Sequence, residues 1–241
     1  MKFLARRFSI FTLFSVLLVL GIGCRSEGPT PASSKESATP EVAVEKVEQV
    51  EQDTPFELEP GFDLLTRDSF EAFDSSPDTW SAVADGISCS GKPRGYLYSK
   101  QPYQNFTMRL EYRFPRPANL KNDSKFKGNT GFLVYVNEPH KLWPICLEVQ
   151  GKYIQIAAIK ENGGAEPVTV EDNETARQTA RKPVGQWNHL EIFSKDGSVR
   201  VSLNGTHISS SKPGTLVSGL IGIQAEDHPF EVRRMRIHAE Q

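Results

Sequence analysis

Strict alternation of apolar and polar side chains from Phe106 to Phe114 constrains the fold of this chain more than any other feature. Successive side chains of a β-strand point to opposite faces of a sheet, so a period of two predicts a strand with one buried and one hydrated face. We expect Leu110 to lie in the middle of the buried set. The apolar positions are Phe106, Met108, Leu110, Tyr112 and Phe114.

Other segments carry the same signal and are joined by short turns. Asn204-Gly205 has the composition of a type I′ hairpin turn, and Lys195-Asp196-Gly197 predicts a second hairpin just before it. Only the stretch from Asn173 to Arg181 favours a helix. The remaining predicted strands cover residues 132–136, 145–150, 153–159, 189–193, 199–203, 206–208 and 220–225.

The last predicted strand needs an irregularity. Phe230 and Val232 share one parity, whereas Met235 and Ile237 share the other. A β-bulge near Arg233-Arg234 would keep all four on the core side. Many short strands punctuated by glycine, proline and turn residues are typical of an all-β fold, and we predict an antiparallel two-sheet sandwich or jelly roll.

The N-terminus resembles a lipoprotein export signal. Basic residues at positions 2, 6 and 7 precede an apolar run from Phe8 to Leu20, and Gly21-Ile22-Gly23 then lead into Cys24. Such a run is too short to span a bilayer in the mature protein. We predict a signal peptide over residues 1–23 and lipidation of Cys24, with an ordinary secretory signal cut near Gly23 as the alternative. The domain would then sit in the cell envelope, bound to the membrane through its lipid alone.

An acidic, proline-containing segment follows the cysteine. Between residues 25 and 60 nine acidic residues outnumber three basic ones, and only one residue is aromatic. Such a composition cannot bury enough apolar surface to offset its ordering entropy, so we predict a disordered linker over 24–60 and one domain over 61–241. The formal net charge of −2 and the absence of a basic stripe argue against nucleic acid as a partner.

Two cysteines remain within the predicted domain. Cys89 and Cys146 could pair in an oxidising compartment or remain as two buried thiols. Nothing in the sequence sets their separation, so we favour the thiols.

Several short motifs, taken in order, span almost the whole predicted domain. They are Trp80-x5-Gly86-Ile87, Gly95-Tyr96-Leu97, Tyr103-x-Asn105-Phe106, Arg109-Leu110-Glu111-Tyr112-Arg113, Gly128-Asn129-Thr130-Gly131-Phe132, Trp143-Pro144-x3-Glu148-Val149-Gln150, Pro183-x-Gly185-Gln186-Trp187-Asn188, Leu203-Asn204-Gly205 and Gly222-Ile223-Gln224, with Phe230-Glu231-Val232-Arg233 last. This ordered set resembles the 3-keto-disaccharide hydrolase family, also described as 3-keto-glucoside lyases and 3-keto-glucal hydratases. The resemblance implies a concanavalin A-like sandwich that acts on 3-keto-sugars. An arginine common in the family is absent from the strand at 132–135, and Gly151-Lys152 stand where an acidic residue is common.

The strand predicted over Ile145–Gln150 suggests a sugar site. Glu148 and Gln150 share one face, opposite the apolar set of this strand, and Trp143 precedes them. Tryptophan offers a flat apolar surface to a sugar ring, while a carboxylate and an amide bind its hydroxyls. The alternative is the ordinary hydrated face of an exposed strand.

The chemistry implied by the resemblance needs a base, an acid and hydrogen-bonding groups. A ketone at C3 acidifies the C2 proton, so a base can remove that proton while the C1 substituent leaves. We assign Glu148 as the base. His228 is assigned as the acid or, alternatively, as the base. The predicted substrate-binding residues are Gln150, Trp143, Asn129, Gln224 and His140. Whether a metal or another cofactor takes part stays open.

Two rival functions remain. The departures from the family pattern favour a non-catalytic, lectin-like glycan-binding module, and a third possibility is an envelope scaffold. For the enzyme and for the glycan-binding module, the partner is a carbohydrate.

Overall fold

The computed structural model describes residues 55–240, which belong to one compact unit, Asp53–Gln241. The predicted signal peptide, Cys24 and most of the predicted linker lie outside the described residues. Within 55–240, no helix is both long and apolar enough to cross a membrane.

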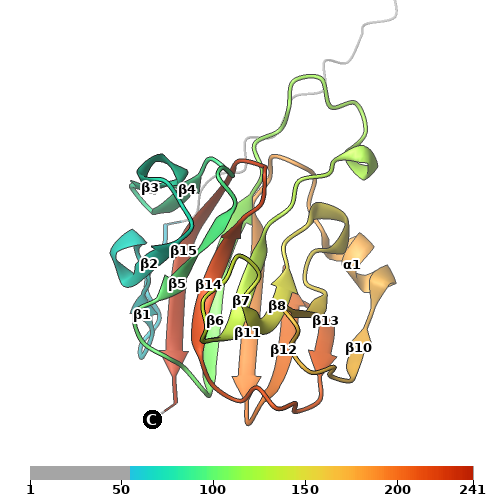
Figure 1. Cartoon of the computed structure of the whole chain (residues 1–241). Coiled ribbons are helices and arrows are strands. Elements are labelled where there is room, and N and C mark those ends of the chain that lie inside the picture. Colours follow the sequence, from blue (N-terminus) through green and yellow to red (C-terminus); the bar gives the residue numbers. More distant parts are fainter. Residues whose placement is uncertain (1–54, 241) are drawn as a thin grey trace, which may run out of the picture. The chain divides into compact units, whose positions relative to one another are not determined.

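Two antiparallel sheets pack face to face, which confirms the predicted sandwich (Figure 1). The nine-stranded sheet has the order β10-β13-β12-β11-β6-β15-β4-β3, with β1 also paired to β15, and the six-stranded sheet has the order β2-β5-β14-β7-β8-β9. The strands are β1 Asp63–Leu64, β2 Phe70–Phe73, β3 Trp80–Val83, β4 Gly86–Cys89, β5 Gly95–Ser99, β6 Phe106–Arg113, β7 Gly131–Asn137, β8 Ile145–Gln150, β9 Ile159–Asn162, β10 Val170–Asp172, β11 Asn188–Lys195, β12 Ser198–Leu203, β13 Thr206–Ser211, β14 Leu220–Ala225 and β15 Phe230–Ala239.

The main apolar core lies between the two sheets. β6 occupies the middle of the larger sheet, between β11 and β15, and buried and partly exposed residues alternate along its whole length. Leu110 has no exposed surface, so the predicted register of this strand is confirmed. Trp80 also belongs to this core.

The predicted turns and the predicted bulge are present. Asn204 and Gly205 have φ values of 49° and 82°, as the hairpin turn requires. The register of β15 against β6 shifts between Arg233 and Arg236, with Arg234 at φ 52°. The four large apolar residues of β15 are therefore all buried in the core: Phe230, Val232, Met235 and Ile237.

The strand predicted over 153–159 is wrong. Residues Tyr153–Gln155 form a 3-10 turn, and β9 begins only at Ile159. The backbone of Gln150 bonds to Ala157 and Ala158, so the segment between them closes a loop at the end of the β8–β9 pair. Tyr153, Ile156 and Ala157 pack into the core from irregular backbone, a tertiary arrangement that the sequence pattern does not reveal. The predicted helix forms as α1, Glu174–Ala180, with the Asn173 side chain accepting a hydrogen bond from the backbone of Ala176 at 2.9 Å.

The two cysteines are buried free thiols. Burial raises the pKa of each thiol to about 12, so neither is a nucleophile at neutral pH. Cys89 ends β4 in the larger sheet, and Cys146 lies in β8 of the smaller sheet.

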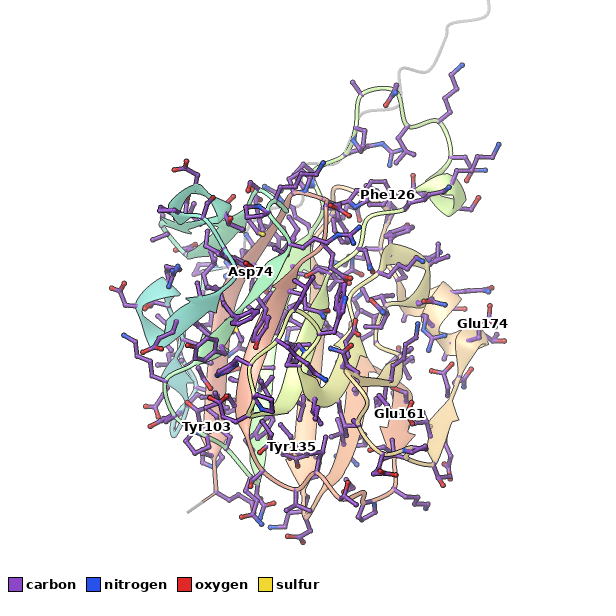
Figure 2. The ribbon with its side chains drawn as sticks, in the orientation of Figure 1. Asp74, Tyr103, Phe126, Tyr135, Glu161 and Glu174 are labelled. Carbon is purple, nitrogen blue, oxygen red and sulfur yellow. The ribbon has the colours of Figure 1, made fainter. Side chains whose placement is uncertain are left out.

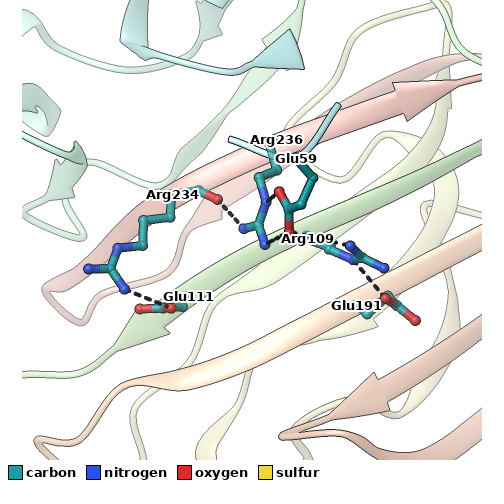
Figure 3. Close-up of polar contacts among 6 residues, drawn as sticks. All are labelled: Glu59, Arg109, Glu111, Glu191, Arg234 and Arg236. Atoms are coloured by element: carbon teal, nitrogen blue, oxygen red, sulfur yellow. Dashed lines mark hydrogen bonds and ion pairs between the residues drawn. The ribbon is translucent and has the colours of Figure 1, made fainter. Parts of the chain in front are cut away.

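The last residues of the predicted linker contact the outer face of the larger sheet (Figure 3). The Glu59 carboxylate accepts two hydrogen bonds from the Arg236 guanidinium, at 2.5 and 2.6 Å, and one from Arg109 at 3.3 Å. Arg109 also binds Glu191 at 2.8 Å. These pairs hold residue 59 against β6 and β15, so the folded domain includes part of the segment predicted as linker.

Candidate functional site

The polar face of β8 is the outer face of the six-stranded sheet. Leu147 and Val149 belong to the core between the sheets, whereas Cys146 belongs to a second, smaller apolar cluster. Glu148 and Gln150 share the parity of Cys146 and therefore lie on that second face. Glu148 is only 8% exposed, so it does not belong to an ordinary hydrated strand face.

A glycine brings side chains from three neighbouring strands together. Gly131 in β7 lies between β8 and β14. A Cβ atom at this position would stand 2.1 Å from Gln224 Oε1 and 2.5 Å from Glu148 Oε1. The absence of a side chain there lets the Glu148 carboxylate and the Gln224 amide converge above the sheet.

Several polar atoms at this convergence lack hydrogen-bond partners. Gln224 is 1% exposed, yet within the described residues neither its amide nitrogen nor its oxygen has a partner, and the same holds for Glu148 Oε1 and Asn129 Oδ1. A buried polar atom without a partner costs about 1–3 kcal/mol, so few survive in native proteins without water or a ligand. Four such atoms in one region indicate a place where a polar ligand binds.

Glu148 holds its proton unusually tightly. Burial and the neighbouring Glu226 carboxylate raise its pKa from 4.5 to about 7, while Lys160, opposite in β9, and the Gln150 amide act in the reverse direction. A carboxyl group with a pKa near neutrality can both take and return a proton. This is the behaviour required of a general base.

Glu226 is a second carboxylate of the site that the sequence interpretation did not single out. Asn129 Nδ2 donates a hydrogen bond of 2.7 Å to Glu226 Oε2. Burial, opposed by Arg94 and reinforced by Asp227, raises the pKa of Glu226. Its position two residues after Gln224 was the available signal, because side chains at i and i+2 share a face.

A cavity of about 700 Å³ borders this region at one end of the sandwich. Asn129 and Glu226 line both the cavity and the polar region described above, and His228 lines it nearby, with its Nδ1 atom 3.3 Å from the Glu226 carbonyl oxygen. Figure 2 labels Phe126, another lining residue, close to this end. Trp143 and Ile154 add apolar surface, with 37% and 42% of each exposed. The other lining residues are Arg94, Ser124, Lys125, Lys127, Lys152 and Asp227.

His140 lies elsewhere. Its Nδ1 atom is 2.7 Å from the Tyr96 hydroxyl, its Nε2 atom is 3.2 Å from Glu138, and its ring packs against Tyr98 at 4.3 Å. Both ring nitrogens are occupied, and the residue does not line the cavity. The structure therefore places His140 as an anchor of the loop that carries Trp143, rather than at the polar convergence.

Among the described residues, His140, His228 and Glu148 form no cluster that could hold a metal ion. Among residues 55–240, no group of three or more His, Cys, Asp or Glu side chains could hold a metal ion.

The architecture and the site define a two-sheet antiparallel sandwich with a polar, partly enclosed cavity beside one sheet. The chain belongs to the family of 3-keto-alpha-glucoside-1,2-lyase-like domains, whose profile matches residues 60–238. The family assigned from the ordered motifs is thereby confirmed, and it places this domain among carbohydrate-active proteins.

Solved structures share the fold. Two crystal structures, each described as a "putative glycosyl hydrolase" from Parabacteroides distasonis ATCC 8503, superpose with TM-scores of 0.55 and 0.54, both at 18% identity. The alignments cover 74% and 75% of this chain and 99% and 94% of those chains. No curated protein sequence matches the chain.

Proposed function

We propose that this chain cleaves 3-keto-glycosides, with Glu148 as the general base. The observation that carries the proposal is the Glu148 carboxyl group, buried with an unpartnered oxygen beside the unpartnered Gln224 amide. A pKa near 7 suits proton abstraction from a carbon acidified by a ketone. The family to which the domain belongs supports this class of substrate.

The site residues divide the reaction among them. Glu148 removes the C2 proton, and the electron pair moves into the C2–C3 bond as the C3 carbonyl becomes an enolate. The Gln224 amide nitrogen, which has no partner among the described residues, donates a hydrogen bond to that developing oxyanion. The enolate then collapses and expels the C1 substituent. Water then adds across the resulting C1=C2 bond: its hydroxyl group bonds to C1, and Glu148 returns the proton to C2. The remaining proton of the water goes to the carboxylate that protonated the leaving group, which completes a net hydrolysis.

The departing C1 oxygen needs a proton, and we assign its donor to Glu226. This carboxyl lines the cavity, and burial raises its pKa, so a larger fraction of it stays protonated than in an exposed glutamate. We assign His228, the acid predicted from the sequence, to binding a sugar hydroxyl, because it lines the same cavity from a half-exposed loop.

Turnover by the purified protein tests the proposal. A 3-keto-disaccharide should be cleaved, and Glu148→Gln should lower kcat by about 10²–10⁴-fold while binding persists, because the amide keeps the shape but accepts no proton. Glu166→Gln, which changes an exposed carboxylate outside the site, is the matched control and should leave the rate unchanged. Parallel assays with and without a divalent cation examine the metal requirement.

A binding module is the second candidate function. It is favoured by the exposed Trp143 ring at the cavity rim, which could hold a sugar without any chemistry. In that case neither the unmodified protein nor Glu148→Gln would turn over a 3-keto-sugar, and Trp143→Ala would abolish glycan binding.

The envelope location is part of the proposal and rests on the sequence before the domain. The basic start, the apolar run and the small residues before Cys24 support a lipid-anchored protein. Mass spectrometry of the mature N-terminus should find a lipidated Cys24. An unmodified terminus at another residue would exclude the lipid anchor.

A further inference from the structure

The cavity beside the site carries an excess of positive charge. Four basic side chains line it, against the two carboxylates Glu226 and Asp227, although the whole chain has a formal net charge of −2. The charge of this cavity is therefore opposite in sign to that of the protein. The basic side chains are Arg94, Lys125, Lys127 and Lys152.

Among the described residues, two of these cations have no acidic partner. Arg94 and Asp227 form an ion pair that cancels both charges, and Lys152 lies close enough to Glu226 to lower its pKa. Within residues 55–240, neither Lys125 nor Lys127 has a carboxylate oxygen within 4.0 Å. Their charges face the cavity without compensation.

The backbone around these two lysines is anchored. Phe126, between them in sequence, is buried and packs against Phe114, Tyr153 and His228, with ring centroids 5.3, 5.8 and 6.1 Å away. A side chain at Gly128 would collide with this ring, since a Cβ atom there would stand 2.3 Å from it. Because Phe126 points inward, its two neighbours are exposed at the rim.

The same cavity offers surfaces suited to a sugar. Trp143 and Ile154 supply exposed apolar area, and the amide of Asn129 leads to the polar region around Glu148. A ligand that fills the cavity therefore meets apolar surface, hydrogen-bonding groups and two uncompensated positive charges together.

We propose that the natural ligand is an anionic glycan, in which a carboxylate or sulfate group next to the reacting sugar binds Lys125 and Lys127. This inference rests on the proposed function of the site and adds the charge of the substrate. Exposed ion pairs contribute modestly and are screened by salt, so two of them should give roughly a tenfold preference for the charged ligand at low ionic strength.

Calorimetric titration of the full chain carrying Glu148→Gln, which blocks turnover, tests the inference. The probes are a neutral disaccharide, a uronate-containing disaccharide and a sulfated disaccharide of the same linkage. The two anionic sugars should bind about tenfold more tightly than the neutral one at low salt, and about 0.5 M NaCl should remove the difference. Preference for only one of them would identify which anionic group is recognised.

The lysines are tested in the same background. The double variant Lys125→Gln/Lys127→Gln should lose the preference while retaining its affinity for the neutral sugar. Lys121→Gln, an exposed lysine of the same loop outside the cavity, is the matched control and should change nothing. Equal affinity for neutral and anionic sugars, or no binding of any probe, or an unaltered double variant would overturn the inference. Absence of turnover on 3-keto-sugars would refute the proposed function but leave a measured charge preference standing.

Discussion

Replacing Glu148 by glutamine should stabilise the folded protein at alkaline pH, although the same change should remove activity. The pKa of Glu148 rises from 4.5 to about 7 on folding, mainly through burial. Each pH unit of such a difference corresponds to about 1.4 kcal/mol, so the full effect is roughly 3 kcal/mol. Glu148 is 8% exposed, and solvent screening therefore reduces this figure little.

The direction of the effect follows from which state holds the proton. Below pH 4.5 the carboxyl is protonated in both states, and its contribution to stability is fully present. Between pH 4.5 and about 7 the unfolded chain has lost the proton while the folded protein keeps it, so stability falls as pH rises. Above about pH 7 the folded site holds a buried charge and that stability is lost. Glutamine resembles the protonated form at every pH.

Urea unfolding of both proteins at about pH 5 and about pH 8.5 measures this effect. The free energy of unfolding of Glu148→Gln, relative to the unmodified protein, should increase by about 2–3 kcal/mol between the two conditions. Other titrating groups are common to both proteins and largely cancel in the comparison. Glu166→Gln, the exposed control, should show no such increase. A difference that stays constant with pH would mean that Glu148 is not buried as a proton-binding group, and its assignment as the base would fall with it.

Three further changes test separate parts of the structure. Gly131→Ala should lower turnover and sugar binding at least about tenfold with little loss of secondary structure by circular dichroism, because the methyl group displaces the Gln224 amide. Leu110→Ala should cost about 2–5 kcal/mol in urea unfolding, and a smaller loss would contradict its complete burial. Glu59→Gln should destabilise the domain at neutral pH. Arg236 lowers the pKa of Glu59 from 4.5 to about 2, so this difference should disappear as pH falls from 4.5 towards 2.

The core-facing strands could be predicted from the sequence because alternate side chains of such a strand pack into the core. The alternation around Leu110 set the register of β6, and the change of parity along β15 required the bulge at Arg233–Arg234. Parity also separated Glu148 and Gln150 from the apolar residues of β8. In each case the pattern of neighbouring residues was sufficient to predict the orientation, because a period of two shows which face of the sheet is buried.

Features that depend on contacts between distant segments could not be predicted in this way. His140 is a typical loop histidine by sequence, yet its ring is held by Tyr96, a residue 44 positions away. The apolar composition of residues 153–158 favours a strand, but the segment forms a 3-10 turn and a loop before β9. Glu226 lies two residues after Gln224, so the parity rule alone was sufficient to predict that both side chains share a face.

The outer faces of the two sheets differ in how their polar side chains are paired. On the nine-stranded sheet, carboxylates and guanidinium groups satisfy one another, as Glu59 does with Arg236 and Glu191 with Arg109. Such pairs stabilise a hydrated sheet face and leave little for a ligand to bind. On the six-stranded sheet, Glu148 and Gln224 are buried and keep atoms without a hydrogen-bond partner among the described residues. Polar side chains alternate with apolar ones in β6 of one sheet and in β8 of the other, so the pairing of the polar atoms is what distinguishes these two strands. A ligand could supply partners for such buried polar atoms, and this supports the proposal that the reaction takes place on the smaller sheet.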